Sequence, residues 1–186
     1  FSEGDKIVVS STLCEFLTIS LDDVLGEVTI FNPQGRFEYE IPSKAFSAMY
    51  SAETFAGDSH RIKVREATDE EAYGVKNIAL NPYDMRGQKK YFPHASANFV
   101  TRDDPCFFER NAIDGVHETA GHGTYPYHSW AGGAREDLEY VLDFGAPVEV
   151  EKVVFYLRAD FPHDTYWKNI DVEFSDGSRA TAELDM

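Results

Sequence analysis

The sequence of 186 residues predicts an all-β protein. Hydrophobic and polar residues alternate with a period of two along most of the chain, as they do in strands with one buried face. Only residues 68–75 carry a good helix-start signal, because Thr68 is followed by Glu71 in the spacing of a capping box. We therefore expect strands to exceed helix greatly, with no helix longer than about three turns.

Five segments of the N-terminal half are expected to be strands: KIVVS (6–10), FLTISLD (16–22), EVTIF (27–31), RFEYEI (36–41) and HRIKVRE (60–66). In the fourth segment Phe37, Tyr39 and Ile41 alternate with charged residues and should face a core. The sequence NPQG (32–35) predicts a tight hairpin turn between the third and fourth strands. The basic residues of the fifth strand form either a solvated face or a surface for an acidic partner, and we favour the solvated face.

Residues 81–93 are rich in Pro, Gly, Asn and charge, and they interrupt the alternation. This segment is expected to be a linker between two sandwiches or a long crossover inside one. We place a domain boundary there, with a smaller β-rich, sandwich-like unit at 1–83 and a second domain at 84–186. The strands expected beyond it are LEYVLDFG (138–145), VEKVVFYLRAD (150–160), NIDVEF (169–174) and RATAEL (179–184), the last two joined by an Asp-Gly turn in SDGS.

Composition restricts the partners. The formal net charge of −16 predicts a surface that repels nucleic acid and anionic lipid, so neither is expected as a partner. No stretch approaches the roughly 18 apolar residues of a membrane span. Cys14 and Cys106 match no zinc or disulfide pattern and are expected to be two free thiols rather than one bridge. No signal peptide is visible and the chain begins at Phe1, so a cytoplasmic and a secreted location both stay open, as does the oligomeric state.

Four short motifs follow one another in the C-terminal half: ERNAIDG (109–115), SW (129–130), YVLDFGAPVEVEKVVFYLR (140–158) and FSDG (174–177). Their order resembles the galactose-binding-like jelly roll of discoidin and coagulation-factor type C domains and of many carbohydrate-binding modules. The resemblance covers residues 93–186 and implies a jelly-roll sandwich, with Trp130 packed inside. Such jelly rolls carry two or three further strands after the last hairpin. We therefore expect that the N-terminal strands complete the sandwich or that the chain is part of a longer protein.

Asp114, in the turn of the first motif, is a candidate calcium ligand. The resemblance implies a structural calcium ion at this turn, and a carboxylate is a suitable ligand for such a hard cation. The sequence departs from the family pattern, because Val116 follows Asp-Gly where a second oxygen ligand is expected. The alternative is a plain Asx turn, in which the carboxylate caps its own backbone.

A cluster of polar and aromatic residues follows the VVFYL run, within RADFPHDTYWKN (158–169). A second such cluster, HGTYPYHSW (122–130), lies in a loop bordered by glycine. Sugars are bound by this mixture, because aromatic faces cover apolar C–H groups while charged and polar groups take the hydroxyls. The residues expected to bind a carbohydrate or similar polyhydroxy ligand, through loops at the end of the sandwich, are His94, His122, Arg158, Asp160, His163, Asp164 and Trp167. For Arg158 and Asp160 the alternative is a structural ion pair.

Enzyme activity is the less favoured interpretation. HETAGH (117–122) differs from the H-E-x-x-H zinc motif, because its histidines are five residues apart rather than four. Two alternatives to non-catalytic binding stay open. One is a metal-dependent enzyme that uses a His/Asp cluster of His94, His122, His163 and Asp164, and the other is a structural or protein-interaction domain.

Overall fold

The computed structural model describes residues 1–12, 14–118, 125–158 and 166–184. The chain divides into two compact units, Phe1–Glu149 and Val150–Met186, which we call unit 1 and unit 2. The domain boundary expected at residues 83 and 84 falls inside unit 1, where Tyr83 and Asp84 are fully buried. Residues 81–93, which we call the crossover segment, therefore lie within one compact unit.

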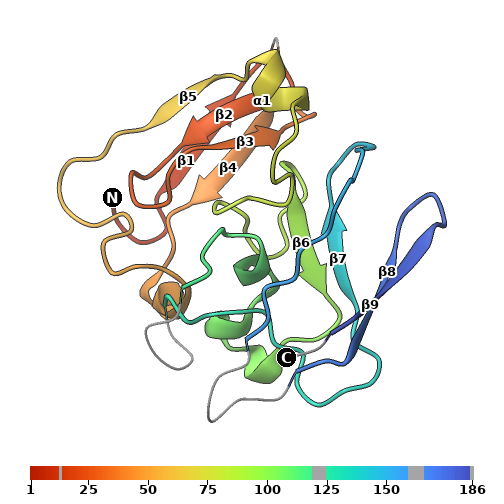
Figure 1. Cartoon of the computed structure of the whole chain (residues 1–186). Coiled ribbons are helices and arrows are strands. Elements are labelled where there is room, and N and C mark those ends of the chain that lie inside the picture. The colour runs from red at the N-terminus through yellow and green to blue at the C-terminus, as the bar shows by residue number, and fades with distance from the viewer. Residues whose placement is uncertain (13, 119–124, 159–165, 185–186) are drawn as a thin grey trace. The chain divides into compact units, whose positions relative to one another are not determined.

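Strands outnumber helices among the described elements, and every strand pair is antiparallel. The β-rich character predicted from the sequence is therefore confirmed. The strands of unit 1 are β1 (Lys6–Ser10), β2 (Phe16–Ser20), β3 (Val28–Phe31), β4 (Arg36–Glu40), β5 (Lys63–Glu66), β6 (His94–Ala97) and β7 (Tyr140–Asp143) (Figure 1). The strands of unit 2 are β8 (Asn169–Glu173) and β9 (Arg179–Glu183). The helices are α1 (Asp69–Tyr73) and the 3₁₀ helices η1 (Lys44–Met49), η2 (Thr101–Asp103), η3 (Pro105–Phe107) and η4 (Glu109–Ala112). None of the helices in the described part of the chain is long and apolar enough to cross a membrane.

Two sheets supply the main core of unit 1. One sheet pairs β1 with β4, and the other has the strand order β3–β2–β5, with every pair antiparallel. Alternate side chains of these strands point to one face, because successive residues of a strand face opposite ways. The strand residues of the core are Ile7, Val9, Leu17, Ile19, Val28, Ile30, Phe37 and Tyr39. The inward face predicted for RFEYEI is therefore confirmed.

The turn at residues 32–35 does not close a hairpin, so the hairpin predicted between the third and fourth strands is wrong. β3 pairs with β2 and β4 pairs with β1, so the strands on either side of this turn belong to different sheets. The turn itself forms, since the Gly35 N–H donates to the Asn32 carbonyl at 3.1 Å. The free edge of β3 is occupied by Phe92, which exchanges two backbone hydrogen bonds with Phe31 at 2.8 and 2.9 Å. The Pro-Gly turn therefore carries the chain from one sheet to the other.

Helix α1 begins where the sequence predicts. The Thr68 hydroxyl accepts from the Glu71 N–H at 3.3 Å, and the Glu71 carboxylate accepts from the Thr68 N–H at 2.9 Å. This capping box satisfies donors that a helix N-terminus otherwise leaves without partners. The Glu71 carboxylate also accepts from the Arg65 guanidinium at 2.6 and 2.7 Å. Because Arg65 belongs to β5, the cap holds α1 beside the β3–β2–β5 sheet.

A second buried cluster lies around the 3₁₀ helices and includes Met49, Tyr50, Val100, Cys106, Phe107 and Phe108. Trp130, which the resemblance places inside, packs against this cluster and donates its indole N–H to the Phe99 carbonyl at 3.1 Å. Both cysteines are free thiols, as expected. Burial, together with Asp104, raises the pKa of Cys106 to about 12, so this thiol is unreactive at neutral pH.

Unit 2 contains the predicted hairpin but not the predicted strand before it. β8 and β9 pair over five residues each, and the turn at 175–178 closes with a bond from the Phe174 N–H to the Ser178 carbonyl at 2.9 Å. Residues 150–158 form no strand, and Val153, Val154, Phe155 and Tyr156 are exposed. Alternation along the sequence is a tendency, and a strand forms only where the backbone joins a sheet. The strand predicted at 150–160 is not formed over the described residues 150–158.

Candidate functional site

The expected ligand residues fall in different parts of the chain. Four of them, His122, Asp160, His163 and Asp164, lie outside the described residues. His94 belongs to unit 1, whereas Arg158 and Trp167 belong to unit 2. Arg158 is half-buried, and Trp167 precedes β8 with 38% of its surface exposed. Their joint role in ligand binding stays a prediction.

His94 faces a buried carboxylate. Its Nδ1 lies 2.7 Å from Asp84 Oδ1, and Asp84 is fully buried. The same carboxylate accepts from the Ala95 N–H at 2.9 Å and from the Gln88 side-chain amide at 3.0 Å. Burial lowers the pKa of His94, but the hydrogen bond and charge of Asp84, together with the charges of Glu109 and Asp143, outweigh burial and raise it. The imidazole therefore holds β6 to the crossover segment.

Asp114 belongs to a second buried network, which involves two residues that the sequence did not single out. Its Oδ1 accepts from the Val116 N–H at 2.9 Å, as in the Asx turn given as the alternative. Its Oδ2 bonds the His128 imidazole and lies 3.7 Å from the Arg110 guanidinium. The Arg110 side chain is 1% exposed and stacks over the Tyr50 ring, 4.8 Å from its centroid. Both carboxylate oxygens thus have partners within the protein.

These networks connect segments that are distant along the chain. The Arg110 guanidinium donates to the backbone carbonyls of Pro82 at 2.7 Å and of Asp84 at 3.0 Å, so it ties η4 to the crossover segment. Among the residues that the structure describes, no group of three or more His, Cys, Asp or Glu side chains is placed to hold a metal ion. The calcium site at Asp114 stays a prediction.

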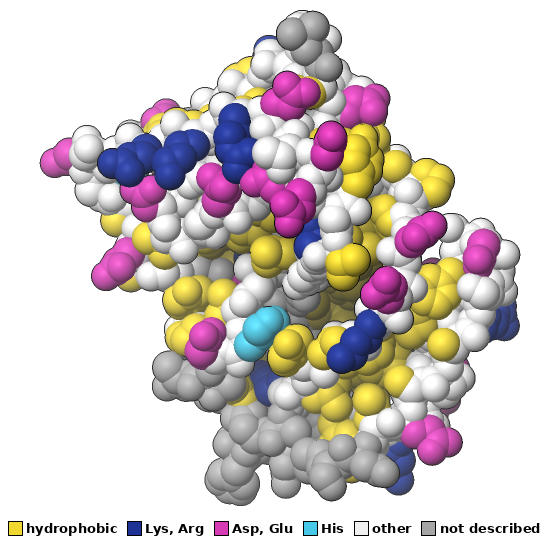
Figure 2. All heavy atoms as spheres, turned by 45° about the horizontal axis from the view of Figure 1, so that its top comes forward, with side chains coloured by type: hydrophobic (Ala, Val, Ile, Leu, Met, Phe, Trp, Pro, Cys, Tyr) yellow, Lys and Arg dark blue, Asp and Glu magenta, His cyan; other side chains and the backbone are white. Residues whose placement is uncertain are grey.

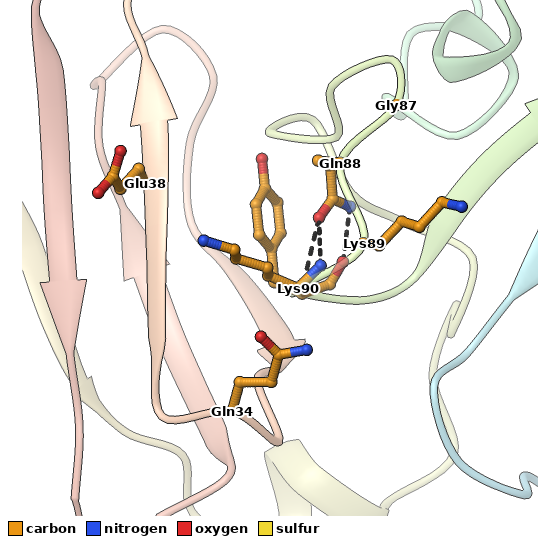
Figure 3. Close-up of a pocket in the computed structure, with 7 residues that line it drawn as sticks. Gln34, Glu38, Gly87, Gln88, Lys89 and Lys90 are labelled. Carbon is orange, nitrogen blue, oxygen red and sulfur yellow. Dashed lines mark hydrogen bonds between the residues drawn. The ribbon is translucent and has the colours of Figure 1, made fainter.

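A shallow pocket of about 390 Å³ lies beside β4 (Figure 3). Its loop is held by Gln88, whose side-chain oxygen accepts from the N–H groups of Lys90 at 2.9 Å and Tyr91 at 3.2 Å. The Gln88 amide also donates to the Tyr91 carbonyl at 2.7 Å. Figure 3 shows the Lys89 and Lys90 side chains pointing in opposite directions. These two cations do not converge, and the pocket is a weak candidate for a ligand site.

A larger groove, of about 520 Å³, lies on the face of the β3–β2–β5 sheet that points away from the core. Its volume is within the range of roughly 300–1,000 Å³ that is usual for ligand pockets. We call it the aromatic groove. Besides β2 and β3, it is lined by parts of α1 and of the segments 76–80, 92–93 and 144–149, all within unit 1. Figure 2 shows a surface on which exposed hydrophobic side chains lie among carboxylates.

Four aromatic rings follow one another along the aromatic groove. The Phe16 ring lies 5.3 Å from the Tyr73 ring and 5.0 Å from the Phe31 ring, and the Phe31 ring lies 6.4 Å from the Phe92 ring. Tyr73 is 75% exposed, while the other three are partly buried. The row arises from strand register, because Phe16 pairs with Phe31 while Leu17 turns to the core. It is the feature that sequence reasoning missed, and its signal was the aromatic residues at outward positions of two strands.

Polar groups lie beside the rings. Thr18 pairs with Thr29 on the same face, with their hydroxyl oxygens 3.1 Å apart. Arg65 of β5 lies across from Thr18 and bonds both Glu71 and Glu27, the latter at 3.1 Å. The hydrogen bonds from Arg65, and then those from Thr68, hold the pKa of Glu71 well below its usual range. The basic stripe expected on the fifth strand therefore meets acidic partners within the protein at Arg65.

Three charged residues, Lys76, Glu27 and Glu149, also line the groove. The Lys76 ammonium donates to the Glu71 backbone carbonyl, and burial lowers the pKa of this lysine. Glu27 lies at the start of β3, and Glu149 ends the segment 144–149. The aromatic groove thus combines an apolar row with hydroxyl, carboxylate and ammonium groups.

The chain was also compared with known proteins. No family model, curated protein or solved structure matches it.

Proposed function

We propose that the protein binds a carbohydrate, or a similar polyhydroxy ligand, without catalysing a reaction on it. The observation that carries the proposal is the row of four rings along the aromatic groove. A pyranose ring has an apolar face of C–H groups and a rim of hydroxyl groups. Aromatic rings cover the apolar face, and charged or polar side chains bind the rim. The aromatic groove offers both kinds of contact.

The carboxylates of the groove support binding rather than acid–base catalysis. A general acid needs a carboxyl group whose pKa is raised towards the working pH. The pKa of Glu71 is lowered instead, because Arg65 and Thr68 stabilise its ionised form. Glu27 is held by the same guanidinium at 3.1 Å. The Glu71 carboxylate therefore stays ionised, and its oxygens are of the kind that accept hydrogen bonds from ligand hydroxyls.

The proposal extends to the C-terminal half. The order of the four motifs supports a galactose-binding-like jelly roll over residues 93–186. In this arrangement the loops around Arg158 and Trp167 form a separate ligand-binding region, which belongs to unit 2. The exposure of the Trp167 ring supports such a role, since a large aromatic side chain in a polar loop is a suitable sugar contact.

A protein-interaction function is the second candidate, and one observation favours it. Val153, Val154, Phe155 and Tyr156 are between 38% and 68% exposed in a continuous run. Contiguous exposed apolar residues commonly mark interaction surfaces. Such a surface is compatible with carbohydrate binding by unit 1.

The test is a glycan array, followed by titration of the best binder with variants. Tyr73→Ala removes the most exposed ring of the row and should weaken binding about 10-fold to 100-fold, as removal of an aromatic anchor often does. The melting temperature should hardly change, because Tyr73 is 75% exposed. Val75→Ala is the control, since it truncates an exposed apolar side chain of unit 1 that does not line the groove.

The outcomes separate the two contact regions. If Trp167→Ala weakens binding and Tyr73→Ala does not, the ligand site is the predicted loop region, and the groove is not the site. If the array shows no binding to any glycan, the carbohydrate function itself is wrong. If Trp167→Ala markedly lowers the melting temperature, that tryptophan is part of the packing and is not a ligand contact.

A further inference from the structure

The charges around the aromatic groove are predominantly negative. Three glutamates, Glu27, Glu71 and Glu149, are among the described residues that line it, and Lys76 is the single cationic residue of that lining. The whole chain carries a formal net charge of −16, so the long-range field has the same sign. A bound anion in this groove would therefore meet carboxylates on more than one side.

The cations near the groove are already engaged by the protein. The Arg65 guanidinium contacts Glu71 through two nitrogens, at 2.6 and 2.7 Å, and Glu27 at 3.1 Å. It also donates to its neighbour, the Glu66 carbonyl, at 3.2 Å. The Lys76 ammonium is directed to the Glu71 carbonyl. A ligand carboxylate or sulfate group that displaced Glu71 or Glu27 from the Arg65 guanidinium would leave that glutamate without its partner.

We infer that the aromatic groove selects neutral glycans and rejects those that carry uronic acid or sulfate groups. This inference rests on the proposed function, because it names the class of carbohydrate that the same site takes. A neutral sugar needs only the ring faces and acceptors for its hydroxyl donors, and the carboxylates supply such acceptors. An acidic sugar brings its negative charge close to the three glutamates of the lining, and like charges repel.

The experiment compares glycans that differ only in charge. Suitable pairs are oligogalacturonate with its methyl ester, dextran sulfate with dextran, and a carboxylated glucan with the parent glucan. The neutral member of any pair that binds should bind at least tenfold more tightly than the acidic member. The affinity for the acidic member should rise when salt is raised to about 0.15 M, because salt screens the repulsion.

Two variants test whether the charges of the groove cause the selectivity. Glu149→Gln removes one negative charge from the lining and should lower the ratio of acidic to neutral dissociation constants at least threefold. Glu53→Gln is the matched control, since it removes an exposed charge of unit 1 that does not line the groove, and it should leave the ratio unchanged. An unchanged ratio in Glu149→Gln, or an equal fall in Glu53→Gln, contradicts selection by the groove.

The result also separates this inference from the proposed function. If acidic glycans bind as tightly as their neutral counterparts or more tightly, the inference is wrong while carbohydrate binding stands. If no member of any pair binds, carbohydrate binding fails and the inference fails with it.

Discussion

At the scale of single residues, Asp84 has a fully buried carboxylate with several hydrogen-bond partners. It accepts hydrogen bonds from the Ala95 N–H and the Gln88 amide in addition to its contact with His94. The backbone carbonyl of the same residue accepts from Arg110. A buried charge is tolerated when its acceptor positions are filled in this way. Asp84 therefore joins the crossover segment, β6 and η4 in one network.

The first prediction concerns the pH dependence of the His94–Asp84 pair. The pKa of His94 is raised in the folded protein, so the stability from its protonated form is fully present below the unfolded pKa of about 6.5. That stability is lost as the pH rises through the folded pKa. His94→Gln keeps a hydrogen-bond donor for Asp84 but does not titrate. The difference in unfolding free energy between the wild type and His94→Gln should be roughly 2 kcal/mol at its largest, below that pH.

Urea unfolding of both proteins at a series of pH values from about 5 to 9 measures this difference. Groups that titrate in both proteins cancel in the comparison. A difference that stays constant over the whole range would show that folding does not change the pKa of His94, and therefore that Asp84 does not raise it.

The second prediction concerns Asp114. Both of its carboxylate oxygens have protein partners, the Val116 N–H on one side and His128 and Arg110 on the other. We therefore expect that removal of calcium with a chelator leaves the melting temperature unchanged. A bound ion would stabilise the folded state by mass action, so a clear fall in melting temperature that added calcium reverses would establish the calcium site instead.

At the scale of elements, the segment 144–149 differs from β7, the strand before it, because it belongs to no sheet. β7 continues the β6 sheet, and after Asp143 the chain leaves the sheet and lines the aromatic groove. Gly145 is where the direction changes, with a φ of +71° that favours glycine. A Cβ atom added at this position would lie 2.3 Å from the Phe92 ring. Gly145 therefore sets the position of a ring that belongs to the aromatic row.

The third prediction follows from this contact. Gly145→Ala should displace the Phe92 ring, weaken glycan binding and lower the unfolding free energy by more than about 1 kcal/mol. Gly57→Ala is the control, because Gly57 has a similar φ of +86° and no atom within 4 Å of the added Cβ. Thermal unfolding and glycan titration of both variants check the prediction. Equal effects in the two variants would show that backbone strain alone, and not contact with Phe92, is responsible.

At the scale of the whole molecule, the two units differ in how much they bury. Unit 1 holds the sheet core, where Ile19, Ile30 and Phe37 are fully buried. In the described part of unit 2, residues 150–158 and 166–184, no residue is buried. A two-stranded hairpin without a buried face is only marginally stable in water. The stability of the protein therefore resides mainly in unit 1.

The fourth prediction is a contrast in hydrogen exchange. Backbone amides of β2 should exchange on the order of 100-fold more slowly, or slower still, than those of β8, because β2 opens only when the core unfolds. Exchange followed by mass spectrometry measures both strands in one experiment. Equal protection of β8 and β2 would indicate that unit 2 is buried in a way that the described residues do not show.

Strand faces, the helix start and one turn could be predicted from the sequence, because each depends on residues that are close together along the chain. The period of two placed Phe37 and Tyr39 on the buried face of β4, because the backbone alone decides which side chains share a face. Thr68 and Glu71 marked the start of α1, since a capping box is closed within four residues. The Asp-Gly turn between β8 and β9 was likewise predictable from its own residues.

The pairing of strands and the contacts between distant side chains could be seen in the tertiary structure alone. The turn at 32–35 joins two sheets rather than two paired strands, because Phe92, some sixty residues along the chain from Phe31, occupies the edge of β3. The VVFYL segment has the pattern of a strand, but residues 153–157 form no strand in the structure. His94 and Asp84, like the rings of Phe16, Phe31, Tyr73 and Phe92, come together through contacts between distant parts of the chain. Pairing and packing depend on such contacts, and periodicity along the sequence carries no information about them.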